Sequence, residues 1–202
     1  DVGTAIALTS FHQMGNLAGI VPGVDVGLHS GYKKISDDNE ILKASGLSAF
    51  GLPVAQLEVG IPVINVDLMA RYSSYEKSSL VGGGARYGFL KTIPFDVTAL
   101  VIYNKLNVEA GENKFGASVM TLSAGINLNV PVLSPYVVIS YDVTELTPDE
   151  KLTSVKGKSS IPRLDGGVNL SLMPLTYLNV GASYLLTEKP DVAYRGGVGM
   201  KF

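Results

Sequence analysis

The sequence has no cysteine and no tryptophan among its 202 residues. Without cysteine the chain can form no disulfide, no thiolate metal site and no cysteine nucleophile. Charged residues make up only 17%, whereas about 25% is usual in soluble domains. The net charge of -2 also excludes the basic surface with which proteins bind nucleic acid, so we expect no nucleic-acid partner.

Long apolar runs are missing as well, although the chain is rather apolar, with a mean hydropathy of +0.26. A transmembrane helix needs about 18 consecutive apolar residues. The nearest stretch, VAQLEVGIPVINVDLMA, is interrupted by glutamine, glutamate, proline, asparagine and aspartate. An apolar chain of one-domain length that contains no membrane helix favours a β-barrel.

Prolines divide the chain at regular intervals. Pro62, Pro94, Pro135 and Pro174 lie 32, 41 and 39 residues apart, which suits one hairpin and two connections per repeat. Proline cannot donate to a β-ladder, so we place each at a turn or at the start of a strand. Counting outward from these turns predicts ten strands, near 22–35, 52–60, 64–75, 80–90, 95–107, 115–130, 136–146, 163–173, 177–187 and 191–202. Short apolar turns at one rim and longer polar connections at the other are typical of membrane barrels.

The predicted strands alternate between an apolar and a polar face. The clearest example sets Ile64, Val66, Leu68, Ala70 and Tyr72 against Asn65, Asp67, Met69 and Arg71. The polar faces are rich in Gly, Ser, Thr and Asn and poor in Lys and Glu, unlike a water-exposed surface. We therefore predict that the apolar face meets lipid and the polar face lines a narrow lumen. A soluble barrel or sandwich is the alternative. Leu100 and Ile102 fall on the polar face, which predicts a β-bulge near them.

Charged side chains on the polar faces must pair with one another, because an unpaired charge inside a barrel is costly. We predict a lumen charge network made of Asp25, His29, Glu58, Asp67, Arg71, Arg86, Asp142, Asp165, Arg195 and Lys201. Aromatic residues near the strand ends predict two girdles at the membrane interfaces. Phe95, Tyr136 and Tyr177 would form one, and Tyr72, Tyr75, Tyr103 and Tyr184 the other.

The first twenty residues differ from the rest. Leu8, Phe11, Met14 and Leu17 recur every three residues, as in a short amphipathic helix. We predict an N-terminal segment, 1–20, that packs inside the barrel or against it as a lumen or periplasmic helix. A further strand and a partner-binding helix are the alternatives. Residues 21–202 would form the barrel.

The chain ends in an alternating strand, YRGGVGMKF, whose apolar face includes Tyr194, Val198, Met200 and Phe202. This ending resembles the terminal signal of bacterial outer-membrane proteins, which the barrel-assembly machinery recognises. The stretch GGGARYGFLKTIPFDVTALVIYNKL resembles a family of uncharacterised bacterial outer-membrane barrels. The resemblance implies a location in the bacterial outer membrane and contact with its lipid, and it implies no activity. The pattern and the resemblance together predict an all-β, antiparallel up-and-down transmembrane barrel of about ten strands, with eight and twelve as alternatives. The chain starts at Asp1 without methionine, so we also expect export through a removed signal peptide, although trimming would leave the same start.

Candidate catalytic groups are few. His29 lies one pair from Asp25 on the same face, so a His–Asp dyad can form, but the motifs of omptin proteases cannot be matched. VGGGARYG lacks the spacing and the helix of a phosphate-binding loop. TPDEKLTSVKGKSS lacks the regular oxygen ligands of a calcium loop. We therefore expect no enzyme, no cofactor and no metal.

The prediction for function follows from barrel size. Barrels of about eight strands are filled by their own side chains, whereas sixteen-stranded porins leave an aqueous channel. We expect a non-enzymatic structural or interaction component of the Gram-negative envelope, alone or as a subunit of a larger assembly. A narrow, porin-like channel or transporter for small solutes is the alternative. Protein partners would bind through the connections 36–51 and 147–162, since loops on a rigid barrel commonly carry binding.

Overall fold

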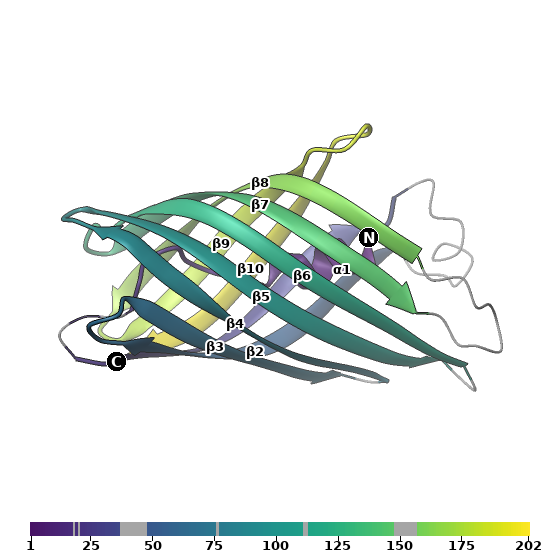
Figure 1. Cartoon of the computed structure of the whole chain (residues 1–202), viewed down its shortest axis with the longest axis horizontal. Helices are drawn as coiled ribbons and strands as arrows, with labels where there is room; N and C mark the ends of the chain where they lie inside the picture. The colour runs from purple at the N-terminus through teal and green to yellow at the C-terminus, as the bar shows by residue number, and fades with distance from the viewer. Residues whose placement is uncertain (18, 20, 37–47, 76, 111–112, 148–156) are drawn as a thin grey trace.

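Each strand of the sheet pairs with its neighbours in sequence, and the first strand pairs with the last, so that the sheet closes on itself. The computed structural model describes all residues except 18, 20, 37–47, 76, 111–112 and 148–156. The described residues form one helix and ten antiparallel strands (Figure 1). Their bounds are α1 Val2–Leu8, β1 Gly23–Lys34, β2 Ala49–Ile61, β3 Val66–Tyr75, β4 Ser78–Lys91, β5 Phe95–Ala110, β6 Asn113–Leu128, β7 Leu133–Thr147, β8 Gly157–Met173, β9 Thr176–Leu185 and β10 Asp191–Lys201. The predicted ten-stranded barrel with a short N-terminal helix is confirmed.

The eighth strand is the one whose predicted start was most in error. It begins at Gly157 and contains Pro162, although the sequence predicted a start at 163. Residues 157–162 pair with β7, whereas β9 pairs with β8 only from Arg163 onward. Proline is tolerated there because this part of β8 is an edge, where the missing N–H breaks no ladder.

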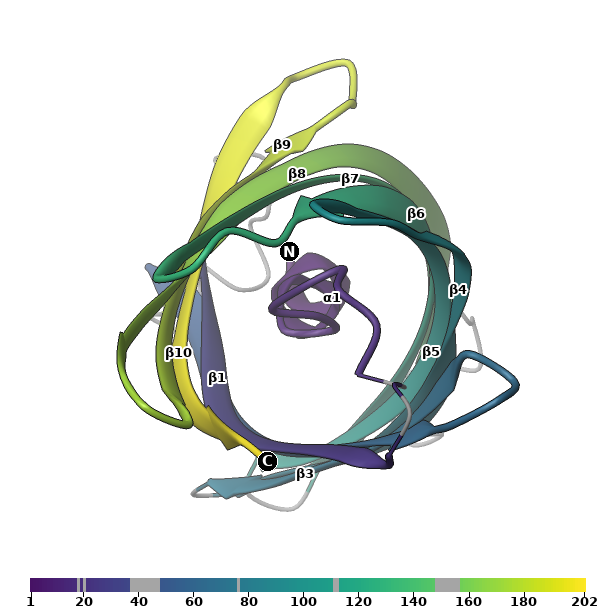
Figure 2. The same ribbon diagram turned by 90° about the vertical axis from the view of Figure 1, so that its left-hand side faces the viewer.

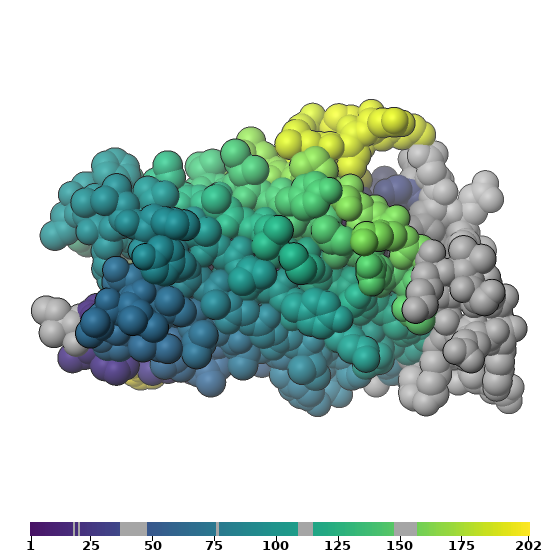
Figure 3. Space-filling model, in the orientation of Figure 1, coloured from purple at the N-terminus to yellow at the C-terminus, as the bar shows by residue number. Residues whose placement is uncertain are grey.

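The barrel is apolar outside and polar inside. Large apolar side chains such as Leu68, Ile139 and Val180 are exposed on the outer wall, while the inward positions carry buried charged and polar residues. Figure 3 shows the outer wall as a closed surface of strand side chains, with the β9–β10 connection standing out from it in yellow. In the described part of the chain, no helix has the length and apolar character to cross a membrane. Along each strand, apolar residues that point outward alternate with polar residues that point into the lumen, which is the pattern of a membrane barrel.

The predicted bulge near Leu100 and Ile102 is wrong. The register of β5 with β6 is continuous, and the shift in its register with β4 lies in β4, between Gly88 and Leu90. Both side chains do point inward, where they pack with Phe11 and Met14 of the N-terminal segment. Their position on the polar face therefore marks where the segment docks, and it needs no irregularity in the strand.

The predicted aromatic girdle at the short-turn rim is also partly wrong. Phe95 is exposed on the outer wall, but Tyr136 and Tyr177 point into the lumen and are only 2% and 4% exposed. Tyr177 is followed by the outward Leu178, so its place on the inner face follows from the alternation of the strand. The tyrosines of the opposite rim, Tyr72, Tyr75, Tyr103 and Tyr184, do face outward.

Candidate functional site: a lumen filled by the N-terminal segment

The first seventeen residues, here called the lumen segment, run through the barrel from one rim to the other. At the rim of the long connections, the Asp1 carboxylate accepts hydrogen bonds from Ser36 Oγ at 2.7 Å and from the Ser36 N–H at 3.2 Å. At the rim of the short turns, the N–H of Leu17 donates to Asp67 at 2.9 Å. Figure 2, which looks along the barrel, shows α1 in the middle of the ring of strands. The segment therefore occupies the whole length of the lumen.

The helix is shorter than the periodicity of the sequence predicted. It ends at Leu8, where Thr9 Oγ1 donates to the carbonyl of Ile6 at 2.9 Å, and residues 9–17 continue without regular structure. Every residue of α1 is buried, so the helix has no solvent-exposed face. The barrel wall surrounds the helix on all sides, whereas an amphipathic helix suits a position where one face is buried and the other meets water.

Wall side chains from four strands satisfy the carbonyls of the lumen segment. Asn179 donates to the carbonyl of His12 at 2.9 Å, and Thr98 donates to that of Met14 at 2.9 Å. Arg163 and Arg86 donate to the carbonyls of Ala7 and Gln13 at 3.1 and 3.0 Å. Backbone that is buried without a strand partner requires such donors. The wall is thus built to hold this particular stretch of chain.

Four charged residues form the first group in the wall, here called the Arg163 cluster: Asp142, Arg163, Asp165 and Arg195. Arg163 Nε donates to Asp142 at 2.6 Å, and its Nη1 donates to Asp165. Arg195 Nη1 lies 3.2 Å from Asp165. Sequence reasoning missed Arg163, although its place two residues before Asp165, on the same face of β8, was the available signal.

Three charged residues form the second group, the Arg86 cluster: Glu58, Asp67 and Arg86. Arg86 donates to Asp67 from Nε at 3.0 Å and from Nη2 at 2.8 Å, and to Glu58 at 2.5 Å. All three side chains are fully buried. Because they come from β2, β3 and β4, they tie three consecutive strands together from the inside.

The third group, the ring cluster, consists of His12, Asp25, His29 and Tyr177. Tyr177 Oη donates to Asp25 at 2.8 Å and lies 3.4 Å from His29 Nε2. His12 Nε2 lies 3.1 Å from Asp25, and its Nδ1 lies 3.6 Å from Glu58 of the Arg86 cluster. The structure therefore brings His29 and Asp25 to the same place, with the tyrosine hydroxyl between them.

Arg71 and Lys201 were also predicted to join the charge network. Arg71 donates to Asn104 at 2.5 Å and to Thr9 of the lumen segment, and among the described residues no carboxylate forms an ion pair with it. Lys201 donates to Gln13 of the segment and lies 5.2 Å from the centre of the Tyr177 ring. These two cations thus contact the segment.

The remaining predicted sites lie at the surface. Tyr194, Val198, Met200 and Phe202, the predicted assembly signal, are all exposed on the outer wall. Phe202 also exchanges two backbone hydrogen bonds with Val24, at 2.8 and 3.0 Å. In the connections 36–51 and 147–162, residues 37–47 and 148–156 lie outside the described residues.

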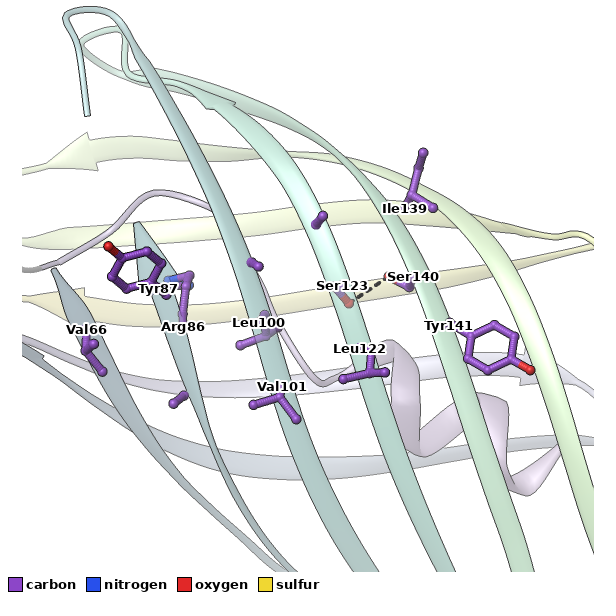
Figure 4. Close-up of a pocket in the computed structure, with 13 residues that line it drawn as sticks. Val66, Arg86, Tyr87, Leu100, Val101, Leu122, Ser123, Ile139, Ser140 and Tyr141 are labelled. Atoms are coloured by element: carbon purple, nitrogen blue, oxygen red, sulfur yellow. Dashed lines mark hydrogen bonds between the residues drawn. The ribbon is translucent and has the colours of Figure 1, made fainter. Parts of the chain in front are cut away.

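A shallow groove of about 560 Å³ lies on the outer wall (Figure 4). Its floor includes Ala85, Ala99 and Ala124, and Tyr87 and Tyr141 line it as well. The hydrogen bond between Ser123 and Ser140, 2.9 Å long, lies on the lumen side of the same strands. The groove therefore belongs to the apolar outer surface. Among the described residues, no three His, Asp or Glu side chains are arranged to hold a metal ion.

Comparison with known proteins gives a likeness of fold. No family model matches the chain, and no curated sequence matches it. The structure resembles the translocator domain of the autotransporter NalP from Neisseria meningitidis, with 11% identity, a TM-score of 0.49, and 98% of this chain and 93% of that chain covered. It also resembles the N-terminal β-barrel domain of Pseudomonas aeruginosa OprF, with 12% identity, a TM-score of 0.44, and 89% and 97% covered. Neisserial surface protein A is similar as well, with 11% identity, a TM-score of 0.40, and 89% of this chain and 93% of that chain covered.

The chain is a closed antiparallel β-barrel of ten described strands with a short N-terminal helix, similar in fold to these outer-membrane barrels. Its apolar outer wall and polar lumen are the pattern of a transmembrane β-barrel, whose outer wall faces lipid. At 12% identity or less, the likeness carries no residue roles from those proteins to this chain.

A prediction about the lumen concerns Gly167, which lies beneath Tyr136. The Tyr136 hydroxyl is fixed by Arg195 and Asn179, each at 3.1 Å. A Cβ at position 167 would lie 2.5 Å from Tyr136 Cζ and 2.8 Å from the carbonyl oxygen of Val180. We expect Gly167→Ala to lower the free energy of unfolding by about 1–3 kcal/mol through overpacking. Urea titration of the refolded barrel, followed by gel mobility, measures it.

The neighbouring glycine is the matched control. A Cβ at Gly166 would come no closer than 4.0 Å to any neighbouring atom, so Gly166→Ala is expected to change stability by about 0.5 kcal/mol or less. Equal losses in the two variants would contradict the placement of Tyr136 over Gly167.

Proposed function

We propose that the protein is a non-enzymatic structural or interaction component of the bacterial outer membrane whose lumen is kept closed by its own N-terminal segment. The observation that carries this proposal is the set of wall donors on the carbonyls of Ala7, His12, Gln13 and Met14. A passage for solutes would have no use for side chains placed to bind a resident peptide backbone. Apolar wall residues such as Leu100 and Ile102 support the same view, because they pack against the segment.

The burial of the candidate catalytic groups supports a non-enzymatic role. His29 and Asp25 are 4% and 1% exposed, and the Tyr177 hydroxyl lies between them. A catalytic dyad has to reach a substrate, and this one is covered by His12 of the lumen segment. The barrel would then act on other molecules by binding them through the connections at the rim of the long connections.

The proposal predicts the conductance of the barrel in planar bilayers. We expect the full chain to insert, to show a heat-dependent shift in gel mobility, and to give no discrete openings. Removal of residues 1–20 is expected to produce openings, because the segment that fills the lumen is gone. A synthetic peptide of residues 1–17 should close these openings again, whereas a peptide of the same composition in scrambled order should not.

Other outcomes separate the alternatives. Discrete openings of the full chain would contradict the closed lumen and favour the second candidate, a narrow channel for small solutes. Silence of the truncated chain after clear insertion would mean that the wall side chains alone close the lumen. Failure to insert, without any gel shift, would contradict the membrane barrel itself.

A further inference from the structure

The closing seam of the barrel, between β1 and β10, has glycine at four of the eight inward positions that pair across it. Along this seam Gly27 pairs with Gly199, and His29 pairs with Gly197. Cross-strand side-chain pairs are the main source of stability in a sheet beyond the backbone ladder, and glycine supplies none. The seam also joins strands from opposite ends of the chain, so it needs stabilisation from elsewhere.

Two rings from the strands on either side of β10 cover these glycines. Tyr177 belongs to β9 and pairs with Gly199, and its ring fills the space where a Cβ of Gly199 would lie. His29 belongs to β1, and its ring occupies the corresponding space at Gly27 and Gly197. The two rings are nearly parallel, with an angle of 13° and centres 6.2 Å apart. With the 2.8 Å hydrogen bond from Tyr177 to Asp25, they link β9 to β1 across β10.

His12 of the lumen segment lies flat on both rings. Its ring centre is 4.4 Å from that of His29 and 4.9 Å from that of Tyr177, with angles of 11° and 3°. Its Nε2 lies 3.1 Å from Asp25 of β1, and its carbonyl accepts from Asn179 of β9. Stacked rings in this distance range attract each other beyond their burial.

The next residue of the segment completes the contact with the third strand. Gln13 donates to Asp25 of β1 at 3.3 Å, and its Oε1 accepts from Lys201 of β10. Residues 12 and 13 thus touch all three strands at the seam, β9, β10 and β1. Other residues of the segment reach the opposite wall, where Ser10 contacts Thr121 of β6.

We propose that the lumen segment has a second task as the clamp of the barrel's closing seam, with His12 as the residue that holds β1 and β9 together over β10. This task is separate from blocking solutes and holds whether or not the lumen conducts. The segment would then belong to the assembly of the barrel, because closure requires the first and last strands to stay paired although glycines interrupt the inner face of the seam.

Hydrogen exchange of the refolded full chain, followed by mass spectrometry, tests the clamp. We expect His12→Ala to speed exchange of the β1 and β10 amides about tenfold, while the β5 and β6 amides keep their rates. Ser10→Ala is the matched control in the same segment and should leave the seam unchanged. His12→Phe keeps a stacked ring and should restore most of the protection.

A covalent staple gives an independent readout, helped by the absence of native cysteine. Leu28 and Val198 face outward and pair directly across the seam, and Val101 and Leu122 do the same between β5 and β6. Cysteines at one pair or the other are joined with a short bifunctional thiol reagent. The seam staple should abolish the effect of His12→Ala on the temperature of the gel shift, and the β5–β6 staple should not.

Three results would overturn the clamp: unchanged exchange in His12→Ala, equal acceleration in all four strands, or equal rescue by the two staples. If His12→Ala does not refold at all, recovery with the seam staple alone supports the clamp. Recovery with neither staple contradicts it. Conductance is not part of this test, so the clamp and the closed lumen can fail separately.

Discussion

Replacement of Arg163 by methionine is expected to lower the free energy of unfolding by about 3–5 kcal/mol. The guanidinium pairs with Asp142 at 2.6 Å and with Asp165, and both carboxylates are buried. Without it, Asp142 keeps only the 2.8 Å hydrogen bond from Thr121 Oγ1 among the described contacts. A buried charge that loses its partner has neither water nor a counter-ion to stabilise it. Urea titration of the barrel in lipid vesicles, followed by the gel shift, measures the loss.

An exposed ion pair at the rim is the control. Lys158 Nζ lies 3.3 Å from Glu145, with side chains 66% and 57% exposed. Since water solvates both groups, Lys158→Met is expected to change stability by about 1 kcal/mol or less. A small effect of Arg163→Met, comparable with this control, would mean that water reaches the Arg163 cluster through the lumen.

Replacement of Phe11 by alanine is expected to cost about 3–5 kcal/mol of stability. Phe11 is the largest apolar side chain of the lumen segment and is 1% exposed. Its ring packs edge-on against Tyr136, with the centres 6.4 Å apart, and the Arg195 guanidinium lies 4.6 Å from its centre. The variant loses apolar burial and a cation–π contact together, and it leaves a cavity between the segment and the wall.

Phe11→Leu separates these contributions. Leucine keeps most of the apolar volume and removes the ring, so a loss of about 1–2 kcal/mol is expected. The same titration in vesicles measures both variants. If Phe11→Ala cost less than about 1 kcal/mol, the side chain would not be held in the lumen, and the docking of the segment would be contradicted.

Local patterns in the sequence were sufficient to predict the barrel. Alternation of apolar and polar residues depends only on the geometry of a single strand, and prolines mark the turns whatever lies around them. For the same reason Asp67, Arg86 and Asp165 could be placed on the inner face. Both predictions agree with the structure, in which the strands form a closed barrel and these three side chains are buried.

Two of the errors share one cause, which is the lumen segment. Leu100 and Ile102 looked misplaced because a lumen was expected to be polar throughout, yet they pack against Phe11 and Met14. Tyr136 looked like an interfacial residue from its place near a turn, yet it hydrogen-bonds with Arg195 and Asn179 inside. The alternation along a strand predicts whether a side chain points outward or into the lumen. It does not predict what fills the lumen and contacts that side chain.

The sequence by itself determined the class of fold, the number of strands, and which side chains face lipid, because these follow from periodicities of two residues along each strand. Only the tertiary structure decided how the inward groups combine: which carboxylate pairs with Arg163 or Arg86, and how His12 comes to lie over His29 and Tyr177. Apart from Arg163 and Asp165, those partners lie on different strands or on the lumen segment. Their meeting depends on the register of the closed sheet and on the path of the lumen segment, which no local pattern encodes.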